Sequence, residues 1–169
     1  MKKITLLIIT LFVFYNALQA QETGRKVPSV EIKDLAGRTI NTNTLKNDNG
    51  LIIIDFFALW CKPCVLELDN INELYESWQA ETGVKIIAIS VDDTRSTSKV
   101  AGFANGRGWK FDIYLDANSD FKRAMNVNNI PHTFLIKNGE IIWQHNSYAQ
   151  GDEDELYELI KKETALLKK

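Results

Sequence analysis

The sequence predicts an α/β fold with a central mixed sheet flanked by helices. Two apolar runs, 51–57 and 84–91, are nearly continuous and rich in β-branched residues, as in strands that are covered on both faces. Apolar residues recur at helical spacing between them, so we expect a right-handed crossover that joins two parallel strands. Later, Asn138-Gly139 stands between alternating apolar residues, which predicts an antiparallel hairpin and makes the sheet mixed.

The remaining elements follow in chain order from local patterns. Two short segments around the turn Ala36-Gly37 predict an N-terminal β-hairpin. Near the C-terminus, acidic residues precede apolar residues at helical spacing, as in an amphipathic helix. The expected strands are 30–34, 38–41, 51–57, 84–91, 111–115, 132–137 and 140–145. One helix is expected to begin near Pro63 and to end near Gly83, and the others are expected at 99–105, 120–125 and 152–169.

The first twenty residues have the pattern of a secretory signal peptide. Lys2 and Lys3 precede an apolar run, 4–15, that is shorter than the roughly 20 residues a membrane span needs. We therefore expect residues 1–20 to be a signal peptide and residues 21–169 to be the folded domain. The protein would be exported to the periplasm, or tethered to the membrane if the signal is not cleaved.

Charge and length narrow the function classes. Removing residues 1–20 takes away two lysines and no acidic residue, so the formal net charge falls from −2 to −4. An acidic chain without a basic stripe is not expected to bind nucleic acid. The remaining length is enough for one domain with its own core and too short for two, and we expect a monomer.

The two cysteines carry the strongest functional signal. Two residues separate Cys61 from Cys64, and the pair stands directly before a predicted helix, which is typical of a redox-active dithiol. Free N–H groups and the dipole at a helix N-terminus stabilise a thiolate and lower a cysteine pKa from about 8.5 to between roughly 3.5 and 7.5. Pro63 suits the first helical turn, where its missing N–H costs nothing. The second sulfur can then resolve a mixed disulfide made by the first.

The order of these motifs resembles the thioredoxin superfamily. A strand leads into the motif WCKPC at 60–64, a crossover follows, and Ile130-Pro131 precedes the hairpin and the last helix. Over residues 27–167 the chain is most similar to the exported TlpA-like and ResA-like thiol-disulfide oxidoreductases. The resemblance implies a thioredoxin-like fold with an N-terminal β-hairpin and an inserted strand-helix element at about 92–115.

The resemblance also implies roles for single residues. Cys61 would be the attacking thiol and Cys64 the resolving thiol, and the two would form the redox-active disulfide. Pro131 matches the family's cis-proline, which leaves the backbone of the preceding residue free to pair with an extended substrate. The residues that would contact the substrate are Trp60, Lys62, Pro63, Ile130 and Pro131.

Two acidic residues stand where family members place proton-handling carboxylates. Asp55 lies six residues before Cys61 and Glu67 three residues after Cys64. A carboxyl group buried beneath the dithiol would have a raised pKa and could take the proton of Cys64. The alternatives are a hydrogen-bonded core carboxyl at Asp55 and a solvated helix residue at Glu67. Asp69 stands at the position of the family's helix-kinking proline, so the sequence does not predict whether this helix is kinked.

The predicted function is the reduction of protein disulfides by an exported oxidoreductase that needs no cofactor. The resemblance implies a disulfide-containing protein substrate, with apocytochrome c as one candidate, and a membrane-bound electron donor. Three alternatives are weaker. A peroxiredoxin-like peroxidase needs the pattern P-x-x-x-[TS]-x-x-C, but Ile54 and Ala58 occupy its first two fixed positions. A copper carrier would have three residues between its cysteines, whereas two residues separate Cys61 from Cys64. A zinc site that adds His132 and His145 to the cysteines is disfavoured by Pro63 within the cysteine pair.

Overall fold

A computed structural model describes residues 24–48 and 50–167, so the predicted signal peptide at 1–20 lies outside the described residues. The strands are β1 (Glu31–Asp34), β2 (Thr39–Asn41), β3 (Ile52–Phe57), β4 (Lys85–Ser90), β5 (Asp112–Leu115), β6 (His132–Lys137) and β7 (Glu140–Asn146). The helices are η1, a short 3-10 helix (Thr42–Thr44), α2 (Lys62–Thr82), α3 (Thr97–Arg107), α4 (Asp120–Ala124) and α5 (Asp152–Leu167).

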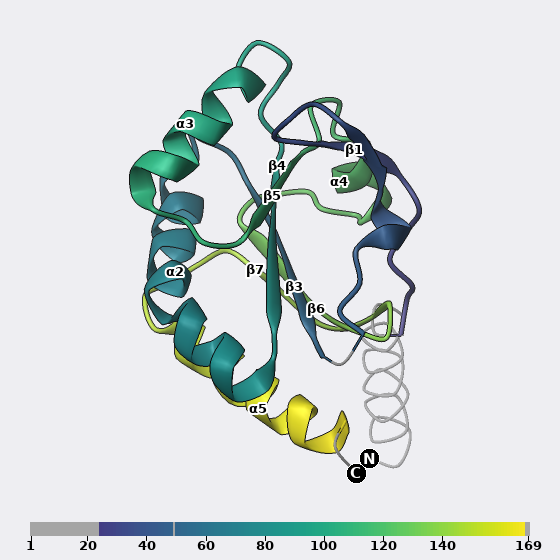
Figure 1. Cartoon of the computed structure of the whole chain (residues 1–169), viewed down its shortest axis with the longest axis vertical. Coiled ribbons are helices and arrows are strands. Elements are labelled where there is room, and N and C mark those ends of the chain that lie inside the picture. The colour runs from purple at the N-terminus through teal and green to yellow at the C-terminus, as the bar shows by residue number, and fades with distance from the viewer. Residues whose placement is uncertain (1–23, 49, 168–169) are drawn as a thin grey trace, which may run out of the picture.

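The strands of the described part of the chain form one mixed sheet in the order β2-β1-β5-β4-β3-β6-β7. β3, β4 and β5 are parallel, and β6 runs antiparallel beside β3. Figure 1 shows helices on both sides of this sheet, which confirms the predicted α/β class. No helix within residues 24–48 and 50–167 is both long and apolar enough to cross a membrane.

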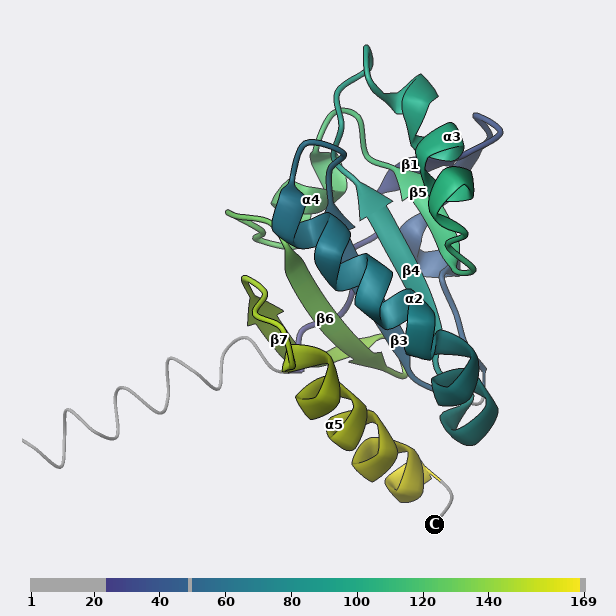
Figure 2. The same cartoon turned by 90° about the vertical axis from the view of Figure 1, so that its left-hand side faces the viewer.

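The two faces of the sheet carry separate apolar cores. On one face, Ile53 and Phe57 of β3 pack with residues of α2, α3 and α5. On the other face, Ile54 and Phe56 pack with α4 and the N-terminal hairpin. In Figure 2, α2 and α5 lie side by side in front of the sheet. The alternation means that odd-numbered residues of β3 point toward α2.

Every predicted element is present, and each described end lies within two residues of its expected position. The predicted end of the last helix, 168–169, lies outside the described residues. The largest difference is in α3, which begins two residues before and ends two residues after the expected bounds.

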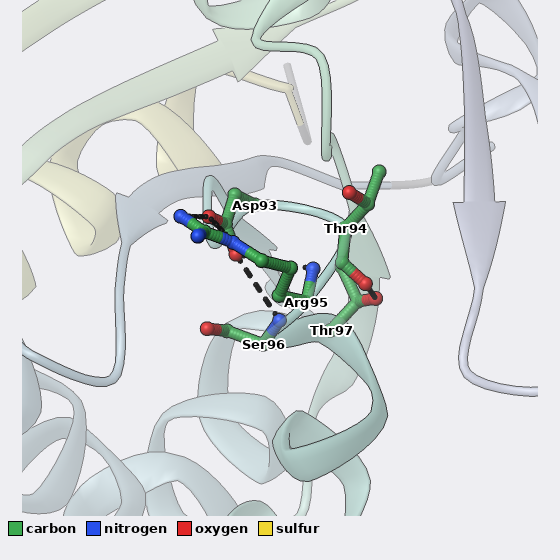
Figure 3. A network of polar contacts seen from close by, with 5 residues as sticks. All are labelled: Asp93, Thr94, Arg95, Ser96 and Thr97. Carbon is green, nitrogen blue, oxygen red and sulfur yellow. Dashed lines mark hydrogen bonds and ion pairs between the residues drawn. The ribbon is translucent and has the colours of Figure 1, made fainter.

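A turn precedes α3, and in it Oδ1 of Asp93 accepts the backbone N–H groups of Arg95 and Ser96, both at 3.1 Å. Figure 3 shows this turn, in which Arg95 also pairs with the Asp93 carboxylate. The N-cap residue Ser96 makes no side-chain capping hydrogen bond, and apolar spacing does not mark the ends of a helix of which only Val100 and Ala104 are buried.

α2 is an unbroken helix of 21 residues and carries the cysteine motif at its start. It ends at Gly83, as predicted, where the backbone turns into the left-handed region with φ +71°. Asp69, at the place of the family's kinking proline, accepts the indole N–H of Trp109 at 2.8 Å and pairs with Arg107. This residue therefore ties α2 to the segment after α3.

Candidate active site

The two cysteines form a disulfide at the N-terminus of α2. Cys61 is the N-cap residue, and its Sγ accepts the backbone N–H of Cys64 at 3.3 Å. Pro63 lies in the first turn, as its position in the sequence predicts. Cys64 is fully buried, whereas Cys61 keeps 5% of its surface exposed. Of the two cysteines, Cys61 is the one whose sulfur accepts a helix N–H group and whose side chain keeps a small exposed fraction.

The loop that leads into the motif is held from the neighbouring strand. Asp92 follows β4 and is buried, and its Oδ2 accepts the backbone N–H of Leu59 at 3.0 Å. The same oxygen accepts the hydroxyl of Ser90 at 2.9 Å. β3 and β4 are parallel, so their C-terminal ends meet at one edge of the sheet and bring Asp92 to the loop before Cys61.

The residues predicted to contact the substrate lie at the same edge. Trp60 is 71% exposed, and Lys62 and Pro63 are exposed beside it. Ile130-Pro131 is a cis peptide, as predicted, and leads directly into β6. Since β6 pairs with β3, this peptide lies at the end of the sheet where β3 turns toward the motif.

Asp55 and Glu67 are brought together by a third residue, Thr133. Asp55 and Thr133 are direct partners across β3 and β6, and both face α2. The Thr133 hydroxyl lies 2.9 Å from Oδ2 of Asp55 and 2.8 Å from Oε1 of Glu67. All three side chains are buried. The alternative that Glu67 is a solvated helix residue is therefore wrong, and Asp55 is buried and hydrogen-bonded.

This arrangement requires a bound proton. A threonine hydroxyl has one hydrogen and can donate to only one of the two carboxyl groups. The other contact is a hydrogen bond only if that carboxyl group is protonated and donates to the hydroxyl. Burial raises the pKa of Asp55 to about 7, and burial together with the Asp55 charge raises the pKa of Glu67 to about 10. Near neutral pH, the pair therefore holds at least one proton.

The second oxygen of each carboxyl group, Oδ1 of Asp55 and Oε2 of Glu67, is buried and has no hydrogen-bond partner among residues 24–48 and 50–167. A buried charge without partners is costly, so the pair takes up a proton readily. Glu67 and Cys64 are three residues apart on one helix and so share a face. The arrangement can therefore receive a proton from the buried cysteine.

Sequence reasoning proposed Asp55 and Glu67 but missed Thr133 and Asp92. Thr133 is a polar residue directly before the apolar run 134–136 and two positions after Pro131, and that placement was the available signal. Asp92 offered a similar signal, because it directly follows the second buried strand. Neither signal shows which side chain each residue meets.

The residues of the zinc alternative are used in other ways. The ring of His132 stacks on Phe134, with centroids 4.5 Å apart, and its Nε2 lies 3.3 Å from Oε1 of Gln144. His145 pairs with Asp152. In the described part of the chain, no cluster of three or more His, Cys, Asp or Glu residues has a geometry that could hold a metal ion.

Comparison with known proteins gives a consistent picture. The model of the AhpC/TSA family matches residues 23–144. The chain is 33% identical over 132 residues to the thiol-disulfide oxidoreductase ResA of Bacillus anthracis, which covers 78% of this chain and 73% of that protein. Among solved structures it is similar to an uncharacterized thioredoxin-like protein from Porphyromonas gingivalis, with 45% identity, a TM-score of 0.73 and coverage of 83% and 92% of the two chains. StoA of Bacillus subtilis shares the fold, with 21% identity, a TM-score of 0.60 and coverage of 78% and 97%.

Proposed function

The chain belongs to the AhpC/TSA family and is a thiol-disulfide oxidoreductase of the ResA type with a thioredoxin-like fold, and on this premise we propose that it reduces the disulfides of protein substrates. One observation carries the proposal. The Cys61–Cys64 disulfide caps α2, and the buried carboxyl pair of Asp55 and Glu67 is joined through Thr133 on the side of the sheet that faces this helix.

The proposed reaction begins with the reduced dithiol. The Cys61 thiolate attacks a substrate disulfide, and one substrate sulfur leaves as a thiolate that takes a proton from solvent. Cys64 then gives its proton to the carboxyl pair and attacks Sγ of Cys61. The second substrate thiolate leaves, and the Cys61–Cys64 disulfide forms. Two electrons pass from the protein to the substrate, and one proton stays on the carboxyl pair.

Three residues around the motif support a protein as the substrate. Trp60 offers an exposed apolar surface, and Lys62 places a positive charge beside the attacking sulfur. The backbone of Ile130, before Pro131, is proposed to pair with an extended segment of the substrate. An exposed apolar side chain beside a backbone that can pair with a strand suits a polypeptide better than a small disulfide.

Location and partners are part of the same proposal. The pattern of residues 1–20 supports export to the periplasm, with a membrane tether as the form taken if the signal is not cleaved. A reductase in an oxidising compartment needs a continuous supply of electrons, so we propose a membrane-bound donor. Apocytochrome c is the proposed substrate class, and the protein is proposed to act as a monomer.

A peroxidase reaction is not favoured by the residues around Cys61. Ile54 and Ala58 occupy the positions of the proline and the hydroxyl residue in the peroxidase pattern, and both are buried apolar residues. The site therefore has no hydroxyl at that position to bind a peroxide. The copper alternative also lacks support, because two residues separate Cys61 from Cys64, whereas a copper carrier would have three residues between its cysteines.

A redox titration tests the proposed direction of electron flow. The protein is equilibrated in buffers of oxidised and reduced dithiothreitol, and the fluorescence of Trp60, beside Cys61, reports the state of the dithiol. We expect a potential nearer to about −270 mV, as in thioredoxin, than to about −120 mV, as in a strong oxidant. We also expect Cys64→Ser to trap mixed disulfides with a reducible protein and Cys61→Ser to trap none. A potential near the oxidising value, with oxidation of reduced proteins, would overturn the proposal.

A further inference from the structure

A small cavity lies beside the carboxyl pair, between α2, the β6–β7 hairpin and the N-terminal end of α5. Its volume is about 10 Å³, which is enough for about one water molecule. The polar residues that line it come from the carboxyl site and from the surface. They are Glu67, Thr133, His145, Tyr148, Asp152 and Glu153.

The inner end of the cavity is a buried acid with a free oxygen. Glu67 is only 4% exposed, and its Oε2 is buried without a hydrogen-bond partner in the described part of the chain. In each proposed reaction cycle the carboxyl pair gains the proton of Cys64. That proton returns to Cys64 when a donor reduces the disulfide. In the oxidised protein, between these two steps, the pair can equilibrate with solvent only through a path for protons, because Glu67 is buried and does not contact solvent directly. A water molecule needs two to four polar partners, and this carboxyl group supplies the first.

The outer end of the cavity consists of residues that reach the surface. Nε2 of His145 lies 3.3 Å from Oδ2 of Asp152, and their side chains are 41% and 35% exposed. Tyr148 donates its hydroxyl hydrogen to Glu153 at 2.8 Å and accepts a hydrogen bond from Asn70 at 2.5 Å. Burial and the hydrogen bond to Glu153 raise the pKa of Tyr148 to about 12, so this hydroxyl stays protonated and does not carry the charge.

The titratable groups that face Glu67 can be named for each element around it. They are Asp55 from β3, His145 from β7, Tyr148 from the loop after β7, and Asp152 and Glu153 from α5. Among them, His145 and Asp152 are partly exposed, and the imidazole and the carboxylate can each accept a hydrogen bond from a water molecule.

We propose that one water molecule in this cavity carries the proton between Glu67 and the Asp152–His145 pair, which makes these two surface residues the proton exit of the active site. The Glu67 O–H bond breaks as the water takes the proton, and the water passes a proton to the Asp152 carboxylate or the His145 imidazole, which releases it to solvent. No electrons move in this step. The inference rests on the proposed function, because that function passes the proton of Cys64 to the carboxyl pair to which Glu67 belongs.

The test follows the exchange of the Glu67 proton for deuterium. The oxidised protein is mixed rapidly with D2O, and infrared spectroscopy records the shift of the protonated carboxyl band, assigned by its loss in Glu67→Gln. We expect the double variant Asp152→Asn, His145→Gln to exchange at least tenfold more slowly than the wild type, and Asp152→Glu to restore exchange to within about threefold. Asp154→Asn is the matched control, since Asp154 is exposed on the same helix and does not line the cavity.

A charge effect alone gives a different result. The Asp152 carboxylate contributes to the raised pKa of Glu67, after burial and the Asp55 charge, so its removal shifts the infrared titration of Glu67 to lower pH. If the titration shifts while the exchange rate of the protonated form is unchanged, the proposal is wrong. Slower exchange that imidazole buffer restores supports it. The experiment needs no substrate, so an oxidising potential in the redox titration would refute the reductase function without affecting this result.

Discussion

The hydroxyl of Thr133 lies 2.9 Å from Oδ2 of Asp55, the residue directly across from it in the neighbouring strand. The same hydroxyl lies 2.8 Å from Oε1 of Glu67 on α2. It therefore links an acid of the sheet to an acid of the active-site helix. Two carboxyl groups in a buried site repel each other when both are ionised, and a shared hydroxyl favours the state in which one of them keeps its proton.

Thr133→Val tests this link because it replaces the hydroxyl with a methyl group of similar size. The change leaves two buried carboxyl groups without their common partner, and losing a buried hydrogen-bond partner costs about 1 to 3 kcal/mol. We expect the free energy of unfolding at pH 7 to fall by that amount, measured by urea denaturation of the oxidised protein. Thr133→Ser, which keeps the hydroxyl, should recover most of the loss.

Thr164→Val is the matched control for this substitution. Thr164 is also buried, but its hydroxyl oxygen has no hydrogen-bond partner within residues 24–48 and 50–167. Replacing that hydroxyl removes an unsatisfied polar group, so we expect no loss of stability. Equal losses in Thr133→Val and Thr164→Val would show that the link to the two acids contributes nothing.

The raised pKa values predict how stability depends on pH. Asp55 and Glu67 have pKa values in the folded protein that lie above their values of about 4 in the unfolded chain. At any pH between the unfolded and the folded pKa values, the folded protein therefore binds more protons than the unfolded chain. The contribution of the pair is therefore most favourable below about pH 4 and is lost as the pH rises through 7 toward 10. For one proton the loss is at most about 1.4 kcal/mol per pH unit.

Glu67→Gln removes the larger part of this dependence. Urea denaturation at intervals from pH 5 to 9 should show the variant gaining stability over the wild type as the pH rises. Glu155→Gln serves as the control, because Glu155 is exposed on α5 and its replacement should leave the pH profile parallel to that of the wild type. A Glu67→Gln profile parallel to the wild type would mean that Glu67 is ionised in the folded protein throughout this range.

The replacement of the family's proline by Asp69 predicts a structural role for this residue. Asp69 accepts the indole N–H of Trp109, which is buried, and pairs with Arg107 at the surface. Asp69→Ala leaves the buried indole N–H without its acceptor, so we expect a loss of about 1 to 3 kcal/mol in the free energy of unfolding. Arg107→Ala breaks the partly exposed ion pair and removes the guanidinium that lies 4.7 Å from the centroid of the Phe103 ring, and it should cost about 1 kcal/mol or less. The reverse order would assign the stabilisation to the ion pair.

Local patterns were enough to predict the elements of the fold. β3 and β4 are buried on both faces, so their residues form continuous apolar runs, and Gly83 marks the end of α2. The bounds of α3 were less accurate, by two residues at each end, because only Val100 and Ala104 of this helix are buried and apolar spacing does not mark its ends. Patterns in sequence indicate burial well and helix ends only in part.

The candidate site was predictable only where it is local in the chain. Cys61, Cys64 and Glu67 lie within seven residues of one another, so helical spacing alone relates them. Thr133 meets Asp55 through the register of β3 against β6, and a shift of one residue in that register would turn Thr133 to the other face. The cavity forms where α2, the β6–β7 hairpin and α5 meet. These elements lie far apart in the sequence, so no local pattern predicts their contact.

The positions of the two sulfurs predict which of them reacts first in the reduced protein. Cys61 caps α2, where free N–H groups stabilise a thiolate, and it retains some exposure, whereas Cys64 is fully buried. We expect iodoacetamide at pH 7 to label Cys61 at least tenfold faster than Cys64, as measured by mass spectrometry of the separated peptides. Cys61→Ser should then react about as slowly as Cys64 does in the wild type.

Unfolding provides the control for the alkylation experiment. In urea above the unfolding midpoint, the two cysteines lose their different surroundings and should react at rates within about threefold of each other. If Cys64 were labelled first in the folded protein, Cys64 would be the attacking thiol. The proton of the resolving step would then come from Cys61 at the surface, and the buried carboxyl pair would have no proton to receive. Preferential labelling of Cys61 that disappears on unfolding attributes its reactivity to the folded helix N-terminus.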